Sequence, residues 1–209
     1  MIITGLKRLG KGRYEVSLDG EAAFVLYKGD LARYDLHEGD ELTVETKKRI
    51  YEETLRERAV NRILFLLQSR DYTYRELENK LRQGHYPAEI VEGALAKVSG
   101  YGYINDTEYA RRYVECYRER KSLGKIKQEL LRRGIDRDTV EAAIGEGRRL
   151  QEESGEHPEQ MQIRRLLEKR HFDPDGTDRK EKDRHYAFLM RRGYSSADIM
   201  AVFREYKDI

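Results

Sequence analysis

The first fifty residues alternate between apolar and polar positions, which is the pattern of a β-strand with one buried face. Three apolar residues of one run would share a face: Tyr14, Val16 and Leu18. Three of the next run would do the same: Ala23, Val25 and Tyr27. Asp19-Gly20 separates the two runs, and Asp-Gly is a strong hairpin signal because both central residues of the favoured turn need a positive φ. With residues 2–9 as a third strand, the pattern predicts a small antiparallel sheet.

Beyond Thr43 the spacing of the apolar residues changes to the period of an α-helix. Between residues 52 and 70 the apolar positions form one stripe: Leu55, Ala59, Ile63, Leu66 and Leu67. The helical period continues to the end of the chain, with further candidate helices at residues 106–120 and 158–171. We therefore expect everything after the sheet to be helical.

A short motif recurs three times: Leu81-Arg-Gln-Gly84, Leu131-Arg-Arg-Gly134 and Met190-Arg-Arg-Gly193. Glycine suits the position after a helix because that residue commonly adopts a left-handed conformation, and the basic residues favour the negative end of the helix dipole. The glycines stand 50 and 59 residues apart. An aliphatic residue six positions after each glycine indicates that another helix follows: Ile90, Val140 and Ile199. The repeating unit is therefore about three helices long.

Several of these helices carry start signals. Two pairs of residues have the spacing of a capping box, Thr73 with Glu76 and Ser195 with Asp198. Pro87 suits a first helical position, because proline lacks the N–H that would be unpaired there. Asp136 suits an N-cap.

Together the patterns predict a mainly α-helical protein in which a small antiparallel sheet precedes tandem three-helix repeats. We expect the sheet in residues 1–50 and the repeats in residues 51–104, 105–150 and 151–209, stacked as an elongated, curved, solenoid-like array. Charged residues make up 38% of the chain, against about 25% in a typical globular protein. Little of the chain can therefore be interior, and thin stacked layers suit such limited apolar material.

The second repeat carries a resemblance to a known family. Its signature combines glycine, aromatic, aliphatic and acidic positions: Gly102-Tyr-Ile-Asn-Asp106, Tyr109-Ala110 and Tyr113-Val114. The next helices continue it: Gly124-Lys125-Ile126, Glu129-Leu130 and Gly134-Ile135. In order and spacing these residues resemble the RecX family of regulatory proteins. The N-terminal sheet is similar to an extension found in Gram-positive members, so the resemblance covers nearly the whole chain.

The resemblance implies a non-enzymatic regulator that restrains the RecA recombinase. Such a protein would bind the RecA filament, lodge in its groove, and contact single- or double-stranded DNA there. We expect it to act as a monomer and to need no cofactor.

The charge distribution favours an acidic partner. The formal net charge is only +2, yet residues 111–150 contain 12 basic and 7 acidic side chains. A local positive field attracts DNA phosphates or acidic residues of a filament whatever the chain total is. The candidate RecA or DNA contacts are six basic residues of this segment: Arg111, Arg112, Arg118, Lys121, Lys125 and Arg132.

An ordinary solvated helix face explains the same charges about as well. Glu115 and Glu119 lie one helical turn from the arginine pair at 111–112, where intrahelical ion pairs would form. We expect Lys121 and Lys125, in contrast, to lack such an acidic neighbour.

Aromatic residues offer a second possible contact with nucleic acid. Tyr109, Tyr113 and Tyr117 recur at helical spacing, so packing in the core is favoured over stacking on bases. Tyr101 and Tyr103 lie in a connecting loop, where packing and contact with a partner are equally open.

Catalysis and metal binding find little support. None of the five histidines has the i, i+4 partner or the cysteine companion of a metal site, so surface or capping positions are expected. Neither Gly10-Lys11 nor Gly124-Lys125 is followed by the Ser or Thr of a phosphate-binding loop. A single cysteine excludes an internal disulfide. The lack of a signal peptide's apolar stretch and of an apolar run of about 20 residues predicts a cytoplasmic protein outside the membrane.

Two functions from different classes remain: a regulator that acts on the RecA filament, and an autonomous DNA-binding module whose paired helices resemble a helix-turn-helix. A helix-turn-helix protein normally dimerises and reads bases with one recognition helix. Three similar but unequal repeats offer no obvious single one, so the filament regulator is favoured.

Overall fold

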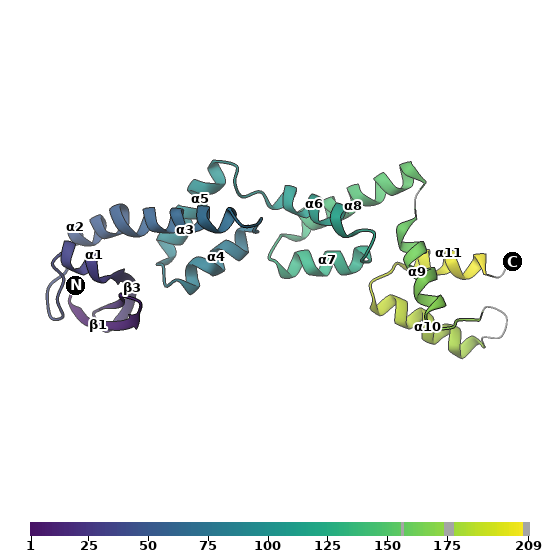
Figure 1. The fold of residues 1–209 in the computed structure, drawn as a ribbon, viewed down its shortest axis with the longest axis horizontal. Coiled ribbons are helices and arrows are strands. Elements are labelled where there is room, and N and C mark those ends of the chain that lie inside the picture. The colour runs from purple at the N-terminus through teal and green to yellow at the C-terminus, as the bar shows by residue number, and fades with distance from the viewer. Residues whose placement is uncertain (156, 174–177, 207–209) are drawn as a thin grey trace. The chain divides into compact units, whose positions relative to one another are not determined.

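The computed structural model describes residues 1–155, 157–173 and 178–206 (Figure 1). The chain divides into two compact units, Met1–Asn105 and Asp106–Ile209. The predicted fold class is confirmed, because a small antiparallel sheet precedes a chain that is otherwise mainly helical.

The sheet contains three antiparallel strands in sequence order: β1 (Ile3–Gly10), β2 (Arg13–Leu18) and β3 (Glu21–Tyr27). The predicted turn joins β2 to β3, where Asp19 and Gly20 have φ values of 50° and 92°. The Asp19 carboxylate also accepts a hydrogen bond of 2.8 Å from the N–H of Ile2, which holds the start of the chain beside the turn.

The two faces of the sheet differ in burial. Val16 and Leu18 of β2 and Phe24 and Leu26 of β3 are buried. The register of the β2–β3 pair shifts between Val16 and Ser17, as at a β-bulge. Residues 23, 25 and 27 lie on the opposite face of β3, which is only partly covered.

A long helix follows the sheet and the short helix α1 (Lys28–Arg33). It consists of α2 (Val44–Arg49), the π-helical segment η1 (Ile50–Leu55) and α3 (Arg56–Leu67). It begins where the hydrophobic period changes, because the Thr43 hydroxyl accepts the N–H of Thr46 at 3.1 Å. At the end of η1 the N–H of Arg56 donates to the carbonyl of Tyr51, the i→i−5 bond of a π-helix.

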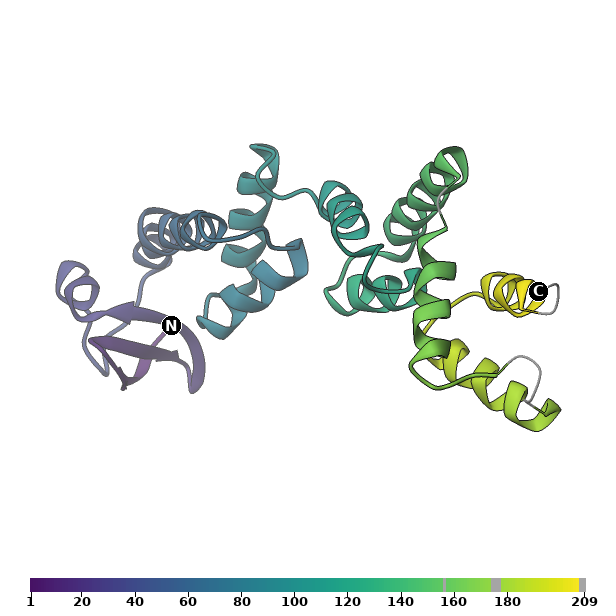
Figure 2. The same cartoon turned by 45° about the vertical axis from the view of Figure 1, so that its right-hand side comes forward.

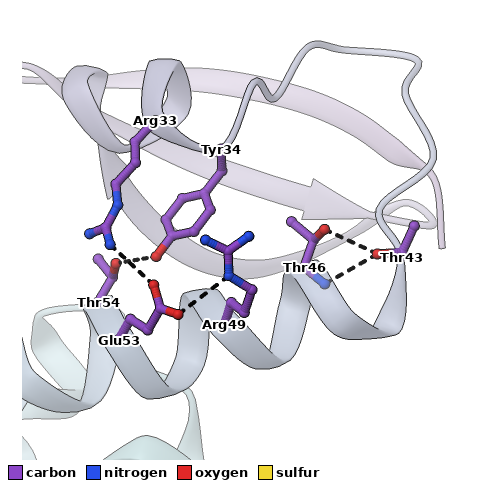
Figure 3. Close-up of polar contacts among 7 residues, drawn as sticks. All are labelled: Arg33, Tyr34, Thr43, Thr46, Arg49, Glu53 and Thr54. Carbon is purple, nitrogen blue, oxygen red and sulfur yellow. Dashed lines mark hydrogen bonds and ion pairs between the residues drawn. The ribbon is translucent and has the colours of Figure 1, made fainter.

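Polar contacts join α1 and the residue after it to the long helix (Figure 3). The Tyr34 hydroxyl and the Thr54 Oγ1 lie 2.8 Å apart and are buried. Glu53 accepts hydrogen bonds from Arg33 at 3.1 Å and from Arg49 at 3.3 Å. The contacts of Arg33 and Tyr34 connect α1, which follows β3 directly, to the long helix.

The first repeat is completed by α4 (Tyr74–Gln83) and α5 (Ala88–Gly100), which both pack against α3. Leu55, Ala59, Ile63 and Leu66 are buried, which confirms the predicted stripe, and Leu67 is partly buried. A single apolar core extends from the sheet to α5.

The second unit contains two groups of helices, visible in Figure 2. The first consists of α6 (Asp106–Tyr117), α7 (Leu123–Arg132) and α8 (Arg137–Ser154). The second consists of α9 (Pro158–Glu168), α10 (Arg179–Arg191) and α11 (Ser196–Glu205). Each group has its own apolar core.

Buried polar contacts connect these two groups. Glu159 accepts the N–H of Leu123 at 3.0 Å, and the Gln162 amide donates to the carbonyl of Arg118 at 2.8 Å. Glu159 is only 5% exposed, and burial raises the pKa of its carboxyl to about 7. The junction between the groups therefore contains a carboxyl that ionises near neutral pH.

The three helix ends differ in one respect from the prediction. Gly134 and Gly193 have the left-handed φ values of 84° and 86° that the motif indicates. In the first repeat Gly84 has φ −79°, and His85 takes the left-handed conformation with φ 61°. The aligned glycines are therefore one position out of register in the first repeat. A Cβ on Gly84 would lie 3.0 Å from the ring of Tyr86, so glycine there makes room for that ring.

The predicted helix starts are largely confirmed. Thr73 forms a capping box with Glu76, and the hydroxyl of Ser195 accepts the N–H of Asp198. The Asp136 carboxylate accepts the N–H of Thr139 at 2.8 Å. Pro87 is the N-cap of α5 and not its first helical residue.

Candidate interaction surface

The six basic residues singled out in the sequence come from α6, α7 and the turn between them. Arg111 and Arg112 lie on α6, and Lys125 and Arg132 lie on α7. Arg118 and Lys121 lie in the turn between the two helices. Their side chains do not form one surface, because several are held by neighbours within the second unit.

Arg111 and Arg112 both bind Glu108 in the first turn of α6. The Arg111 guanidinium donates two hydrogen bonds of 3.0 and 2.9 Å, and the Arg112 Nε donates one of 2.8 Å. These bonds lower the pKa of the Glu108 carboxyl to about 2. Both arginines are therefore paired within their helix, but their partner is Glu108, and not Glu115 or Glu119 as the sequence suggested.

Lys121 is part of the packing between α6 and α7. Its Nζ lies 2.6 Å from Glu129 and 3.3 Å from the Tyr113 hydroxyl, and it stands 4.1 Å from the ring centroid of Tyr117. Burial disfavours the charge, but the hydrogen bonds outweigh it and raise the pKa of Lys121. The prediction that Lys121 lacks an acidic neighbour is wrong, because a carboxylate eight residues later folds back onto it.

Lys125 and Arg132 remain available on α7. Both are exposed, and the spacing of seven residues with Gln128 between them places all three on one helix face. Neither forms an ion pair within residues 1–155, 157–173 and 178–206, although the charge of Lys125 helps to lower the pKa of Glu129, one helical turn later. Arg118 is half-buried and lines a separate cavity of about 290 Å³ together with Glu115 and others.

The tyrosines of α6 pack as predicted. Tyr109, Tyr113 and Tyr117 are partly buried against the core of the second repeat, with ring centroids 6.1 and 4.5 Å apart. In contrast, Tyr101 and Tyr103 are 58% and 62% exposed and contact each other edge to face at 6.2 Å. These two rings therefore contribute little to the core.

The histidines, the metal-ligand residue types and the helices carry three further findings. His185 is buried and its ring contacts Phe172, so the prediction of a surface or capping position is wrong for this residue. In the described ranges, His, Cys, Asp and Glu nowhere gather in groups of three that would hold a metal ion. Among the same residues, no helix combines the length and apolar character that a bilayer crossing requires.

A second basic group lies in the first unit, where counting charges along the chain shows no excess of either sign. A cavity of about 380 Å³ is lined by five basic residues: Arg13, Arg58, Arg62, Lys80 and His85. We call this cavity the cationic pocket. These basic residues come from β2, α3, α4 and the turn after α4. Residues 1–50 contain 9 basic and 9 acidic side chains, and residues 51–110 contain 8 and 10, so a count by segment cannot reveal it.

Family models match three parts of the chain and are described as the first, second and third three-helix domains of RecX: residues 59–97, 105–144 and 158–203. "Regulatory protein RecX" of Trichlorobacter lovleyi is 34% identical over 146 residues, which cover 68% of this chain and 91% of that protein. The protein of the same name from Caldanaerobacter subterraneus subsp. tengcongensis is 31% identical over 146 residues, covering 69% and 74%.

A solved structure described as "Crystal structure of regulatory protein RecX" aligns with 100% of this chain and 99% of that chain. The TM-score is 0.63 and the sequence identity is 26%. The similarity therefore includes the N-terminal sheet as well as the helical repeats.

Proposed function

Because the chain belongs to the RecX family, we propose that it regulates the RecA recombinase by binding the RecA filament on DNA and restraining its activity. The family resemblance identified in the sequence is confirmed by these matches. The relatives are named as regulatory proteins, which supports a role through binding, without catalysis or a cofactor. We propose that it acts in the cytoplasm, where a RecA filament on DNA would be found.

The exposed face of α7 is the observation that carries the proposal for where contact occurs. Lys125 and Arg132 present two exposed cations that form no ion pair in the described part of the chain, on the same helix face as the exposed side chain of Gln128. Arg111 and Arg112 would contribute to the contact while hydrogen-bonded to Glu108. Arg118 would contribute from a cavity that it lines together with Glu115. Lys121 belongs to the fold, and we assign it no contact.

The proposal predicts that the monomeric protein suppresses RecA's DNA-dependent ATP hydrolysis and strand exchange well below one molecule per RecA. Charge reversal of both α7 cations, K125E with R132E, is expected to weaken this suppression by about tenfold or more, because two attractions to phosphate or carboxylate become repulsions. The assay titrates the protein into RecA and DNA at two salt concentrations.

A matched control reverses Lys48 and Lys97, two exposed lysines of the first unit that have no ion pair in the described residues. Equal weakening in both double variants would reject the α7 face as the contact. No effect of the native protein on RecA, together with tight binding to bare DNA, would support the autonomous DNA-binding module instead.

A further inference from the structure

The cationic pocket gathers basic side chains that are far apart in the chain. Arg13 comes from β2, Arg58 and Arg62 from successive turns of α3, and Lys80 from α4, while His85 follows α4. Among the residues that the structure describes, no acidic side chain lines the cavity. Such a concave cluster of one sign concentrates the positive field and attracts anions.

One guanidinium is already oriented in the pocket. Arg58 Nη2 donates to both carboxylate oxygens of Asp30, at 3.1 and 3.0 Å, and the guanidinium carbon lies 4.6 Å from the ring centroid of Tyr27. Arg58 Nη1 is buried and has no hydrogen-bond partner among the described residues. The contacts with Asp30 and Tyr27 therefore fix the Arg58 guanidinium at the wall of the cavity.

The other basic side chains of the pocket are less compensated by acidic groups. Arg13, Arg62 and Lys80 form no ion pair within the ranges that the structure describes, and His85 Nδ1 stands 3.9 Å from Glu15. Like charges held around one cavity repel each other, and an anion with several acceptor oxygens relieves that repulsion. The planar guanidinium groups match the oxygens of a phosphate better than a lone ammonium does.

We propose that the cationic pocket binds a phosphodiester group of a nucleic-acid strand. The volume of about 380 Å³ exceeds that of one phosphate, and Tyr27, Tyr86 and Val25 add an apolar wall that suits the attached sugar or a stacked base. The inference rests on the proposed function and deepens it, since it gives the first unit its own contact with the DNA of the filament. The pocket lies entirely within Met1–Asn105, and α7 lies in the other unit.

The test uses the full chain and a fluorescein-labelled single-stranded oligonucleotide in the absence of RecA, measured by anisotropy from low to moderate salt. The R13A/R62A variant is expected to bind on the order of tenfold more weakly, with a log-log salt slope reduced by roughly 0.7 for each phosphate that the variant no longer neutralises. The matched control K7A/R8A removes two exposed cations of β1 that lie outside the pocket lining, and it should bind like the native chain.

Acylation of lysines, followed by mass spectrometry, locates the contact. The oligonucleotide should slow modification of Lys80 and leave Lys48 unchanged, whereas inorganic phosphate at the same ionic strength should not protect Lys80. Protection by phosphate alone, or unchanged affinity of R13A/R62A with native thermal stability, would overturn the proposal. Because RecA is absent, such a failure would leave the proposed regulation of RecA untouched.

Discussion

Lys121 lies at the turn between α6 and α7, with its ammonium group hydrogen-bonded to Glu129 and to the Tyr113 hydroxyl. The Tyr113 hydroxyl also donates to Glu129 at 2.7 Å, which closes a triangle of polar groups. The lysine and glutamate side chains are only 25% and 21% exposed. Removing the cation would leave a largely buried carboxylate with one partner fewer, which is unfavourable in a site with little water.

Lys121→Ala should therefore destabilise the second repeat by about 2 kcal/mol. Urea denaturation followed by circular dichroism measures the free energy of unfolding. Lys125→Ala is the matched control, and its exposed side chain should change stability by less than about 0.5 kcal/mol. Equal stability of the two variants would contradict a structural role for Lys121.

The sequence shows which segment contains a basic residue, but it does not show which side chains will surround that residue in the folded protein. Lys121 and Lys125 look alike in the sequence, yet one packs against the Tyr113 and Tyr117 rings and the other is exposed. Their surroundings depend on how the turn after α6 folds back. The cationic pocket is unpredictable for the same reason, because it combines segments whose charges balance locally.

Helix ends in this protein depend on a residue in the left-handed conformation after each glycine-motif helix. Gly134 takes this conformation in the second repeat at no steric cost, whereas in the first repeat a side-chain-bearing residue, His85, takes it. A Cβ in the left-handed region costs roughly 1 kcal/mol.

Replacing the glycine at one helix end and the histidine at the other should change the unfolding free energy in opposite directions. Gly134→Ala is expected to lower the unfolding free energy by about 1 kcal/mol, while His85→Gly is expected to raise it by about 0.5 kcal/mol after allowing for the greater entropy of the unfolded glycine. Thermal unfolding of each variant against the native chain checks the signs. A decrease in stability of His85→Gly would show that the histidine side chain contributes more than its backbone strain costs.

Elements are well predicted where the hydrophobic period is long and regular. The hairpin, the stripe of α3 and the capping box of Thr73 all depend on neighbours in the sequence. The register of the first repeat is not predicted, because alignment on glycine assumes that the glycine itself adopts positive φ. In α4 the helix runs one residue further, and the glycine makes room for the ring of Tyr86 instead.

For the whole molecule, the contact between the second and third repeats has the widest consequence. Glu159 is buried at this junction, near Asp198, which disfavours its charge, and Arg148, which favours it. The folded carboxyl has a pKa of about 7 against an ordinary value of 4.5. Between these values the folded chain binds more protons than the unfolded chain, so this contribution to stability is complete at low pH and is lost as pH rises through 7.

Glu159→Gln should reduce the dependence of the unfolding free energy on pH between about 4.5 and 7. The glutamine amide keeps an oxygen that accepts the N–H of Leu123, and it never ionises. Above pH 7 the variant is expected to be more stable than the native chain by up to about 3 kcal/mol, and the two should converge at about pH 4. Unfolding midpoints across this range of pH measure the difference. Parallel profiles for the native chain and Glu159→Gln, or equal flattening in the exposed-residue control Glu21→Gln, would contradict this assignment.

Long-range contacts of this kind lie beyond sequence patterns. The hydroxyl of Ser122 caps α7 and also donates to the carbonyl of Arg192, 70 residues later. A Cβ on Gly124 would collide with the carbonyl oxygen of Gly193. The repeats are predictable from periodicity, but the fit of one repeat against the next depends on side chains and glycines that no local period specifies.

The π-helical segment Ile50–Leu55 bears on which homologues would have the cationic pocket. Its i→i−5 bond accommodates one residue more than an α-helix would. Deleting a single residue there would leave an unbroken α-helix but rotate everything before it by about 100° relative to α3. Arg58 would then lose the register that brings it to Asp30 and Tyr27. A homologue without this insertion would keep the arginines of α3 in its alignment and still lack the pocket that they line here.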